Sequence, residues 1–173
     1  MIFVTVGTTY FDELIMEVDR LAGSGELGQE VIAQRGSGAY EPKNIESFAF
    51  KPGLGEYYER ADLIVSHAAA GTLFTALNVG KRIVAVSNPR LGLYRSGDAR
   101  RAYSRTKGRE FELTNRQMAL PMKLEDEGYL VWCPDVAELE GAIKEAAIKP
   151  LKAYKKPECG IARHVGKLLD SGG

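Results

Sequence analysis

Two short turns of this sequence combine small residues, hydroxyl groups and a histidine at points where a strand is expected to give way to a helix. The first, GTTY, holds Gly7, Thr8 and Thr9, and the second, HAAAGT, runs from His67 to Thr72. The start of a helix offers unpaired backbone N–H groups and about half a positive charge, which suits a phosphate group. Small side chains let a phosphate approach the backbone, and threonine hydroxyls add donors. Both turns are therefore candidates for binding a phosphorylated ligand.

Each turn also has a purely structural interpretation. Gly7 could simply permit a tight turn, and a threonine after it could cap a helix. The alanines 68–70 could pack a helix against a sheet, and a lone histidine such as His67 is more often a structural hydrogen-bonding residue than a catalyst. The sequence contains no GxGxxG, GxxxxGK[ST], GxSxG or HExxH motif, and Gln34 and Arg35 stand where a dinucleotide site would carry an acid. A dinucleotide site is therefore poorly supported.

Short apolar strands alternate with amphipathic helices along most of the chain. Strands are predicted at 2–6, 30–34, 45–50, 62–67, 82–87 and 129–133, and helices at 11–22, 54–61, 71–80, 115–128 and 135–148. This alternation indicates right-handed βαβ units. We therefore predict an α/β, Rossmann-like fold with a mainly parallel six-stranded sheet and helices on both faces. Because ligands bind at the carboxyl ends of the strands in such a sheet, the two turns should lie on one edge.

The chain of 173 residues fits one ordinary domain, which we place at 1–148, followed by a C-terminal tail at 149–173 with a short helix. The helical and strand patterns vanish in a long loop at 88–114. This loop is rich in cationic side chains, namely Arg90, Arg95, Arg100, Arg101, Arg105, Lys107 and Arg109. Loops of this length are usually functional or disordered.

Composition limits the classes of function. Lys plus Arg and Asp plus Glu number 23 each, so the overall charge does not favour nucleic acid or a membrane surface. Cys133 and Cys159 are isolated from each other and from any histidine cluster, so no metal site is expected. The chain has neither a signal-peptide pattern nor an apolar run of about 20 residues. We therefore expect a cytoplasmic protein that binds no nucleic acid.

Several segments together resemble a glycosyltransferase family. These are MIFVTVGTTYFDELI, VIAQRG, ADLIVSHAAAGTLFTALNVGKRIVAV, NRQ and LEDEGYLVWC, which occur in this order between residue 1 and about residue 147. The chain resembles the small donor-binding subunits of two-component UDP-sugar transferases. These include the catalytic subunit of the eukaryotic dolichol-linked UDP-GlcNAc transferase and the small subunits of bacterial exopolysaccharide transferases. They are similar to the C-terminal half of the peptidoglycan GlcNAc transferase, a GT-B enzyme.

The resemblance implies a set of donor-binding residues. The turn of Gly7, Thr8 and Thr9 would face the diphosphate, and the loop His67, Ala69, Ala70, Gly71 and Thr72 would border the donor, with His67 as the catalytic residue. Phe50 and Lys51 fall where the base is usually held. Asn115 and Gln117 match the ends of a family NHQ motif whose glutamine reaches sugar hydroxyls. The UDP-sugar is the substrate, and neither a metal nor another cofactor is implied.

Three positions depart from the family pattern. Ala69 replaces a glycine, Arg116 replaces the histidine of NHQ, and Thr75 replaces an acid that holds the ribose hydroxyls. A carboxylate forms charge-assisted hydrogen bonds that are roughly twice as strong as neutral ones. With Thr75 in place of the acid, we expect either that UDP binds weakly or that the chain binds another nucleotide.

Two functions follow from these observations. The first is the donor-binding subunit of an inverting glycosyltransferase that transfers a sugar such as GlcNAc from a UDP-sugar to a lipid-linked or polysaccharide acceptor. A second, membrane-associated subunit would then supply the acceptor site and recruit the chain to the membrane. The sequence leaves open whether the chain also forms a homo-oligomer. The alternative is a binding or regulatory module with a degraded donor site, which uses its arginine-rich loop to dock on a partner or an anionic surface.

Overall fold

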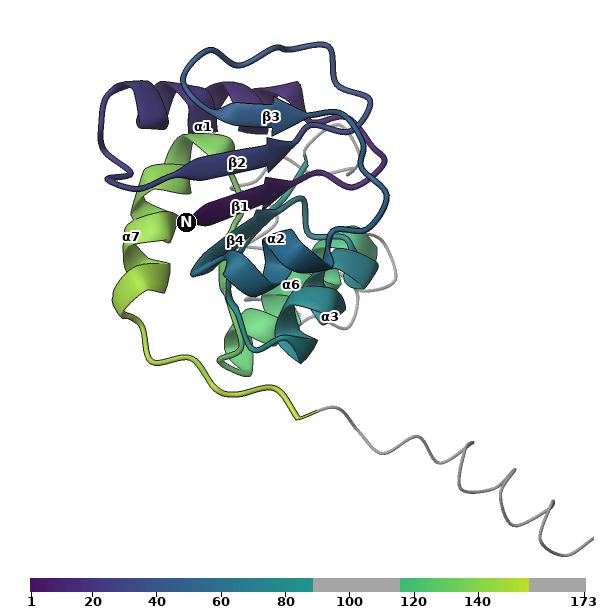
Figure 1. Ribbon diagram of the computed structural model, residues 1–173. Helices are drawn as coiled ribbons and strands as arrows, with labels where there is room; N and C mark the ends of the chain where they lie inside the picture. Colours follow the sequence, from purple (N-terminus) through teal and green to yellow (C-terminus); the bar gives the residue numbers. More distant parts are fainter. Residues whose placement is uncertain (89–115, 156–173) are drawn as a thin grey trace, which may run out of the picture.

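The computed structural model describes residues 1–88 and 116–155 (Figure 1). The strands are β1 (Ile2–Thr5), β2 (Val31–Gln34), β3 (Glu46–Phe48), β4 (Leu63–Ser66), β5 (Arg82–Val86) and β6 (Val131–Cys133). The helices are α1 (Asp12–Gly23), α2 (Gly55–Arg60), α3 (Ala70–Asn78), α6 (Arg116–Asp126) and α7 (Leu139–Ile148), with a 3₁₀ turn at Val136–Glu138 before α7. The six predicted strands and five predicted helices are all present, which confirms the predicted fold class.

The strands form one parallel sheet in the order β3-β2-β1-β4-β5-β6. The chain builds outward from β1 in one direction and then, from β4, in the other. Thr5, the last residue of β1, pairs in register with Gln34 of β2 and with Ser66 of β4. A crevice outside the carboxyl ends of the strands at such a switch point is the usual ligand site of an open α/β sheet.

Two apolar layers enclose the sheet. Helices α1 and α7 cover one face, and α2, α3 and α6 cover the other (Figure 1). The alternation of side chains along β1 sends Ile2 and Val4 to the first layer and Phe3 to the second. Strands buried on both faces are continuous apolar runs in the sequence, which is why the pattern identified them.

Helix α1 also holds the connection between β2 and β3 through a buried carboxylate. Asp19 is only 3% exposed and accepts hydrogen bonds from the backbone N–H of Asn44 (2.7 Å), the backbone N–H of Lys43 (3.0 Å) and the hydroxyl of Tyr40 (2.8 Å). Burial by itself would raise the pKa of Asp19, but these hydrogen bonds together bring it below the ordinary value. The ionised carboxylate therefore stabilises the loop against α1.

We expect Asp19→Asn to lower the free energy of unfolding at pH 7 by about 2–3 kcal/mol, because the amide nitrogen meets N–H donors in a buried place. The depressed pKa means that this stabilisation is present above the unfolded pKa of about 3.9 and is lost as the pH falls through the folded pKa. Urea titrations of both proteins should therefore converge at low pH. The control, Glu41→Gln, removes an exposed ion pair with Arg35 in the same connection and should change little. Equal effects of the two substitutions would contradict the role of Asp19.

The described residues after α7 continue along the domain. The N–H of Lys152 donates to the carbonyl of Gly128 (2.9 Å), and the ring of Tyr154 packs against those of Phe74 and Tyr129. Most of the predicted basic loop and the predicted C-terminal helix lie outside the described residues. Within the described ranges, no helix combines the length and apolar character needed to cross a bilayer.

Candidate functional site

The two turns that the sequence identifies as candidate phosphate sites line the same cavity, of about 510 Å³, which we call the carboxyl-edge cavity. Three segments line it: the turn after β1, the start of α2 and the segment from the end of β4 into α3. The lining residues are Gly7, Thr8, Leu54, Gly55, Tyr58, His67, Ala69, Gly71, Thr72 and Thr75. The cavity therefore lies at the carboxyl edge of the sheet, beside the switch point between β1 and β4, where the topology predicts a ligand.

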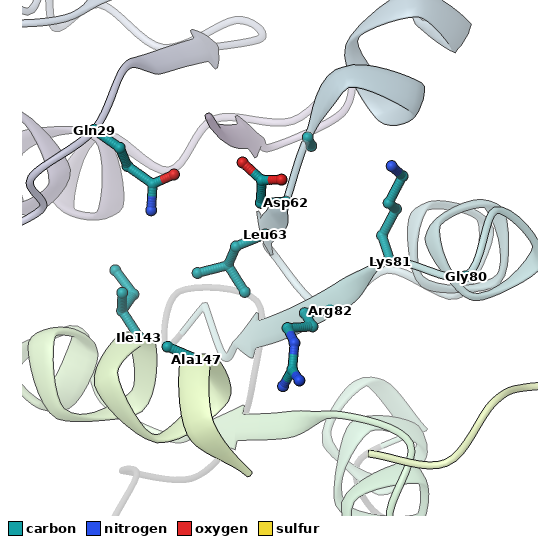
Figure 2. A pocket seen from close by; sticks show the side chains of 9 residues that line it. Gln29, Asp62, Leu63, Gly80, Lys81, Arg82, Ile143 and Ala147 are labelled. Carbon is teal, nitrogen blue, oxygen red and sulfur yellow. The ribbon is translucent and has the colours of Figure 1, made fainter. Parts of the chain in front are cut away.

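A second cavity of about 470 Å³ lies at the opposite edge of the sheet, where β4 and β5 begin (Figure 2). Its two cationic side chains, Lys81 and Arg82, donate hydrogen bonds to carbonyl groups near the ends of helices. The ammonium of Lys81 donates to the carbonyl of Glu59 (2.6 Å), and Arg82 donates to the carbonyls of Ala146 (2.7 Å) and Lys149 (2.9 Å). The side chains of Lys81 and Arg82 point away from each other (Figure 2). The two cationic side chains of the described lining therefore do not converge on one point.

The start of α3 is the main source of free donors in the carboxyl-edge cavity. Ala69 is the N-cap residue and provides no side-chain cap, and the N–H of Leu73 is the first to bond back, to the carbonyl of Ala69 (3.0 Å). Within the described part of the chain, the preceding N–H groups, those of residues 70–72, remain for a ligand. Ala69 has φ −74° and ψ 136°, an ordinary extended conformation, so the backbone here does not require the family's glycine.

The turn after β1 is organised differently. The N–H of Gly7 donates to the hydroxyl of Thr5 (3.2 Å), and both the N–H (3.3 Å) and the hydroxyl (2.9 Å) of Thr9 donate to the carbonyl of Val6. Gly7 has φ +63°, and a Cβ there would lie 3.0 Å from Cε1 of His67. The glycine is therefore required for the shape of the turn and for its close approach to His67, whereas its N–H is already used.

Thr5 joins the two turns, and sequence reasoning missed it. Its hydroxyl accepts from the N–H of Gly7 and donates to the side-chain oxygen of Gln34 (2.6 Å), and its carbonyl accepts from the N–H of His67 (3.3 Å). Both Thr5 and Gln34 are buried. A polar residue at the end of an otherwise apolar strand was the available signal for this positioning pair.

His67 is more buried than a loop position suggests, with 9% of its surface exposed. Its Nδ1 lies 3.3 Å from the carbonyl oxygen of Thr5. Burial lowers the pKa of His67, and the contact with Thr5 offsets this only in part. No Asp, Glu, Lys or Arg is among the described residues that line the cavity. The lowered pKa of His67 therefore favours the neutral imidazole at physiological pH.

Helix α2 forms one wall of the cavity, which sequence reasoning did not predict. Tyr58 is 5% exposed, and burial raises the pKa of its phenol, while an interaction with the side chain of Thr72 acts in the opposite direction.

Two further features belong to α3 and the loop before it. The hydroxyl of Thr75 donates to the carbonyl of Gly71 (2.8 Å) in the first turn of α3. Ala68 adopts φ +65°, a conformation that costs a non-glycine residue energy and often marks a functional loop.

The structure does not bring every predicted residue to the cavity. Phe50 is 55% exposed, and the ammonium of Lys51 lies over the rings of Phe48 (4.7 Å) and Tyr57 (4.9 Å), so neither residue belongs to the lining. Thr9 and Ala70 are also absent from the lining, although both lie next to residues that line it.

The predicted sugar-binding residues of the NRQ segment stay predictions. Asn115 lies outside the described residues, and Gln117 lies in α6 at a position whose side chain is not described. Among the residues that the structure describes, no group of His, Cys, Asp or Glu is arranged to hold a metal ion.

Solved structures support the fold. The glycotransferase of kitacinnamycin superposes with a TM-score of 0.56 at 16% sequence identity, over 98% of this chain and 38% of that one. At this level of identity the likeness concerns the fold, which is that of one part of a larger glycosyltransferase.

Sequence comparisons extend further. UDP-N-acetylglucosamine transferase subunit ALG13 of Homo sapiens is 35% identical over 163 residues, which cover 87% of this chain and 12% of the human protein. The Mus musculus protein of the same name is 32% identical over 142 residues, covering 76% of this chain and 10% of the mouse protein. The chain thus spans only a small part of the length of both relatives. The model of the glycosyltransferase family 28 C-terminal domain matches residues 1–92. With more than half of its length matched by this domain, as the resemblance predicted, the chain belongs to glycosyltransferase family 28.

Proposed function

We propose that this chain is the donor-binding subunit of a glycosyltransferase and that it holds a UDP-sugar, UDP-GlcNAc in the first instance, in the carboxyl-edge cavity. The uncapped start of α3, which opens into this cavity, carries the proposal. Free N–H groups and the helix dipole favour a diphosphate at this place. Two relatives named as UDP-N-acetylglucosamine transferase subunits support the choice of sugar and the expectation of a partner.

The reaction that fits this site is a single displacement with inversion. An acceptor hydroxyl attacks the anomeric carbon, the bond from that carbon to the β-phosphate oxygen breaks, and UDP leaves with the bonding electrons. The N–H groups at the start of α3 and the hydroxyl of Thr72 would stabilise the negative charge on the leaving diphosphate. A base on the acceptor side would take the proton of the hydroxyl.

The acceptor side belongs to a second subunit in this proposal. The subunit would be membrane-associated, present a lipid-linked or polysaccharide acceptor, and recruit this chain from the cytoplasm. The donor cavity opens at the carboxyl edge of the sheet, so the partner would approach that edge. The UDP-sugar enters as substrate, and the proposal requires no further cofactor.

A calorimetric screen of the purified chain tests the donor. We expect binding of UDP-GlcNAc and UDP, and weaker binding of uridine, because uridine lacks the diphosphate that the start of α3 would bind. UDP-glucose and UDP-GalNAc would report the choice of sugar. Absence of binding to every nucleotide would contradict the proposal and favour the alternative, a binding module without a functional donor site.

Thr75 gives a separate test of where the ribose lies. Thr75 lines the cavity, and its hydroxyl is engaged with Gly71, so Thr75→Glu places a carboxylate where the family carries an acid. We expect the affinity for UDP to rise roughly tenfold, because a charge-assisted hydrogen bond contributes about 1.5–3 kcal/mol. Thr75→Gln, of similar shape but uncharged, should give a smaller gain. If Thr75→Glu weakens binding while the wild type binds UDP, the ribose does not lie beside this residue.

A further inference from the structure

We infer that His67 recognises a hydroxyl group of the donor, as a hydrogen-bond acceptor through Nε2, and does not bind the diphosphate. The inference rests on the proposed function and assigns His67 a specific part in it. It differs from the expectation from the resemblance, in which His67 is the catalytic residue.

The tautomer of His67 follows from its contact with Thr5. Nδ1 lies 3.3 Å from the carbonyl oxygen of Thr5, and a carbonyl oxygen can only accept a hydrogen bond. Nδ1 must therefore carry the proton. A neutral imidazole has one N–H, so Nε2 carries a lone pair and acts as an acceptor.

Nε2 of His67 lies beside the turn after β1. A Cβ built on Gly7 would lie 3.0 Å from Cε1 and 3.4 Å from Nε2 of His67, so this edge of the ring faces Gly7. Gly7 and His67 both line the cavity. The other edge of the ring, which carries Nδ1, is held by Thr5 at the end of β1.

The surroundings keep the imidazole neutral. On the β1 side, the imidazole meets Thr5 and Gly7, which carry no charge, and the lining segments of α2 and α3 contribute Tyr58 as their one titratable side chain. No described residue of the lining bears a carboxylate that would stabilise an imidazolium. Burial also lowers the pKa of His67.

This arrangement separates two kinds of recognition. The oxygens of an ionised diphosphate accept hydrogen bonds and cannot donate one, so they cannot pair with Nε2 while His67 is neutral and keeps its proton on Nδ1 for the carbonyl of Thr5. A sugar or ribose hydroxyl can donate to it. The diphosphate is matched by the N–H groups at the start of α3, and the hydroxyl by Nε2 of His67.

Two amide variants of His67 distinguish the roles of its two ring nitrogens. The amide nitrogen of His67→Asn takes the place of Nδ1 and keeps a donor for the carbonyl of Thr5, but the side chain has no group at the place of Nε2. His67→Gln reaches the place of Nε2 and supplies an amide oxygen there. We expect His67→Asn to weaken UDP-GlcNAc binding roughly 5- to 10-fold, as for the loss of one hydrogen bond, and His67→Gln to restore part of that loss.

Three ligands identify the group that His67 binds. A loss in His67→Asn for UDP-GlcNAc, but not for UDP or uridine, places the hydroxyl on the transferred sugar. An equal loss for uridine places it on the ribose. A loss for UDP that is absent for uridine would assign His67 to the diphosphate and overturn the inference. An unchanged affinity for all ligands that the wild type binds would also overturn it, while leaving the proposed function intact.

Proton linkage provides an independent readout. A His67 that bound the diphosphate through Nε2 while keeping the Nδ1 hydrogen bond to Thr5 would have to become protonated, and donor binding near pH 7.5 would then take up a proton. We expect uptake close to zero when the binding enthalpy is measured in buffers with different ionisation enthalpies. Uptake of a sizeable fraction of a proton that disappears in His67→Asn would overturn the inference. If the wild type binds no nucleotide, the proposed function fails and this inference fails with it.

Discussion

Replacing Gly71 with aspartate is expected to stabilise the fold and to abolish donor binding at the same time. Gly71 is the second residue of α3 and lines the cavity, and a Cβ added to it meets no atom within 4 Å. Removing a helical glycine gains about 0.5–1 kcal/mol, and an acid in the first turn adds about 0.3–1 kcal/mol. A carboxylate about 5 Å from a diphosphate charge costs about 3 kcal/mol at an effective dielectric constant of about 20, or at least 100-fold in affinity.

Gly71→Asn is the matched control, because it has the same shape as aspartate without the charge. It should bind UDP far more tightly than Gly71→Asp, and the difference between the two variants should shrink as the salt concentration rises. Calorimetric titration gives the affinities, and thermal melting gives the stability. Equal affinities of the two variants would show that the diphosphate does not lie at the start of α3.

Gly36→Ala is expected to have the largest effect on stability, a loss of about 3 kcal/mol or more. Gly36 follows β2 with φ +59°, and a Cβ there would lie 2.1 Å from the carbonyl oxygen of Thr9 and 2.9 Å from that of Gly7. The left-handed conformation alone costs a non-glycine residue about 1–2 kcal/mol, and the contact requires the backbone of the neighbouring turn to move. That turn borders the carboxyl-edge cavity, so under the proposed function the affinity for UDP should fall as well.

Gly53→Ala provides the comparison for Gly36→Ala. Gly53 also has a positive φ, +75°, but a Cβ there has no atom within 4 Å. The cost of this variant should therefore be limited to the conformational strain of about 1–2 kcal/mol. Urea denaturation of both variants measures the difference. Similar losses of stability in the two variants would show that the turn after β1 moves at little energetic cost to accommodate a side chain at position 36.

Five of the six strands were predictable because they are buried along almost their whole length and are mostly apolar in the sequence. The edge strand β3 (Glu46–Phe48) is partly exposed. Local chemistry also sets helix ends. Asp135 is the N-cap of the 3₁₀ turn before α7 and accepts a hydrogen bond from the N–H of Ala137 (3.0 Å). Gly80 has φ +68° just beyond Val79, the C-cap of α3. These features depend on neighbours in the sequence.

The walls of the site were harder to predict, because they depend on contacts between distant segments. Tyr58 is one of two adjacent tyrosines, and the sequence alone does not show which of them lines the cavity. The burial of His67 and its hydrogen bond to Thr5 require β1 and β4 to be neighbours. The loop with Phe50 follows β3 at the edge of the sheet, two strands away from the switch point, which is why residues predicted there lie outside the lining.

The central position of β1 has a consequence for the order of events during synthesis on the ribosome. Of the six strands of this sheet, β1 is synthesised first, and β2 can cover one of its edges early. Its other edge pairs with β4, so it stays open until Ser66 has left the exit tunnel. The layer that contains Ile2 and Val4 closes later still, when Leu139 and Ile143 of α7 arrive. An uncovered strand edge can pair with other chains, and parallel pairing between distant segments is slow. A nascent chain therefore carries an open strand edge in the middle of the future sheet until β4 has emerged, and during this interval that edge can pair with other chains.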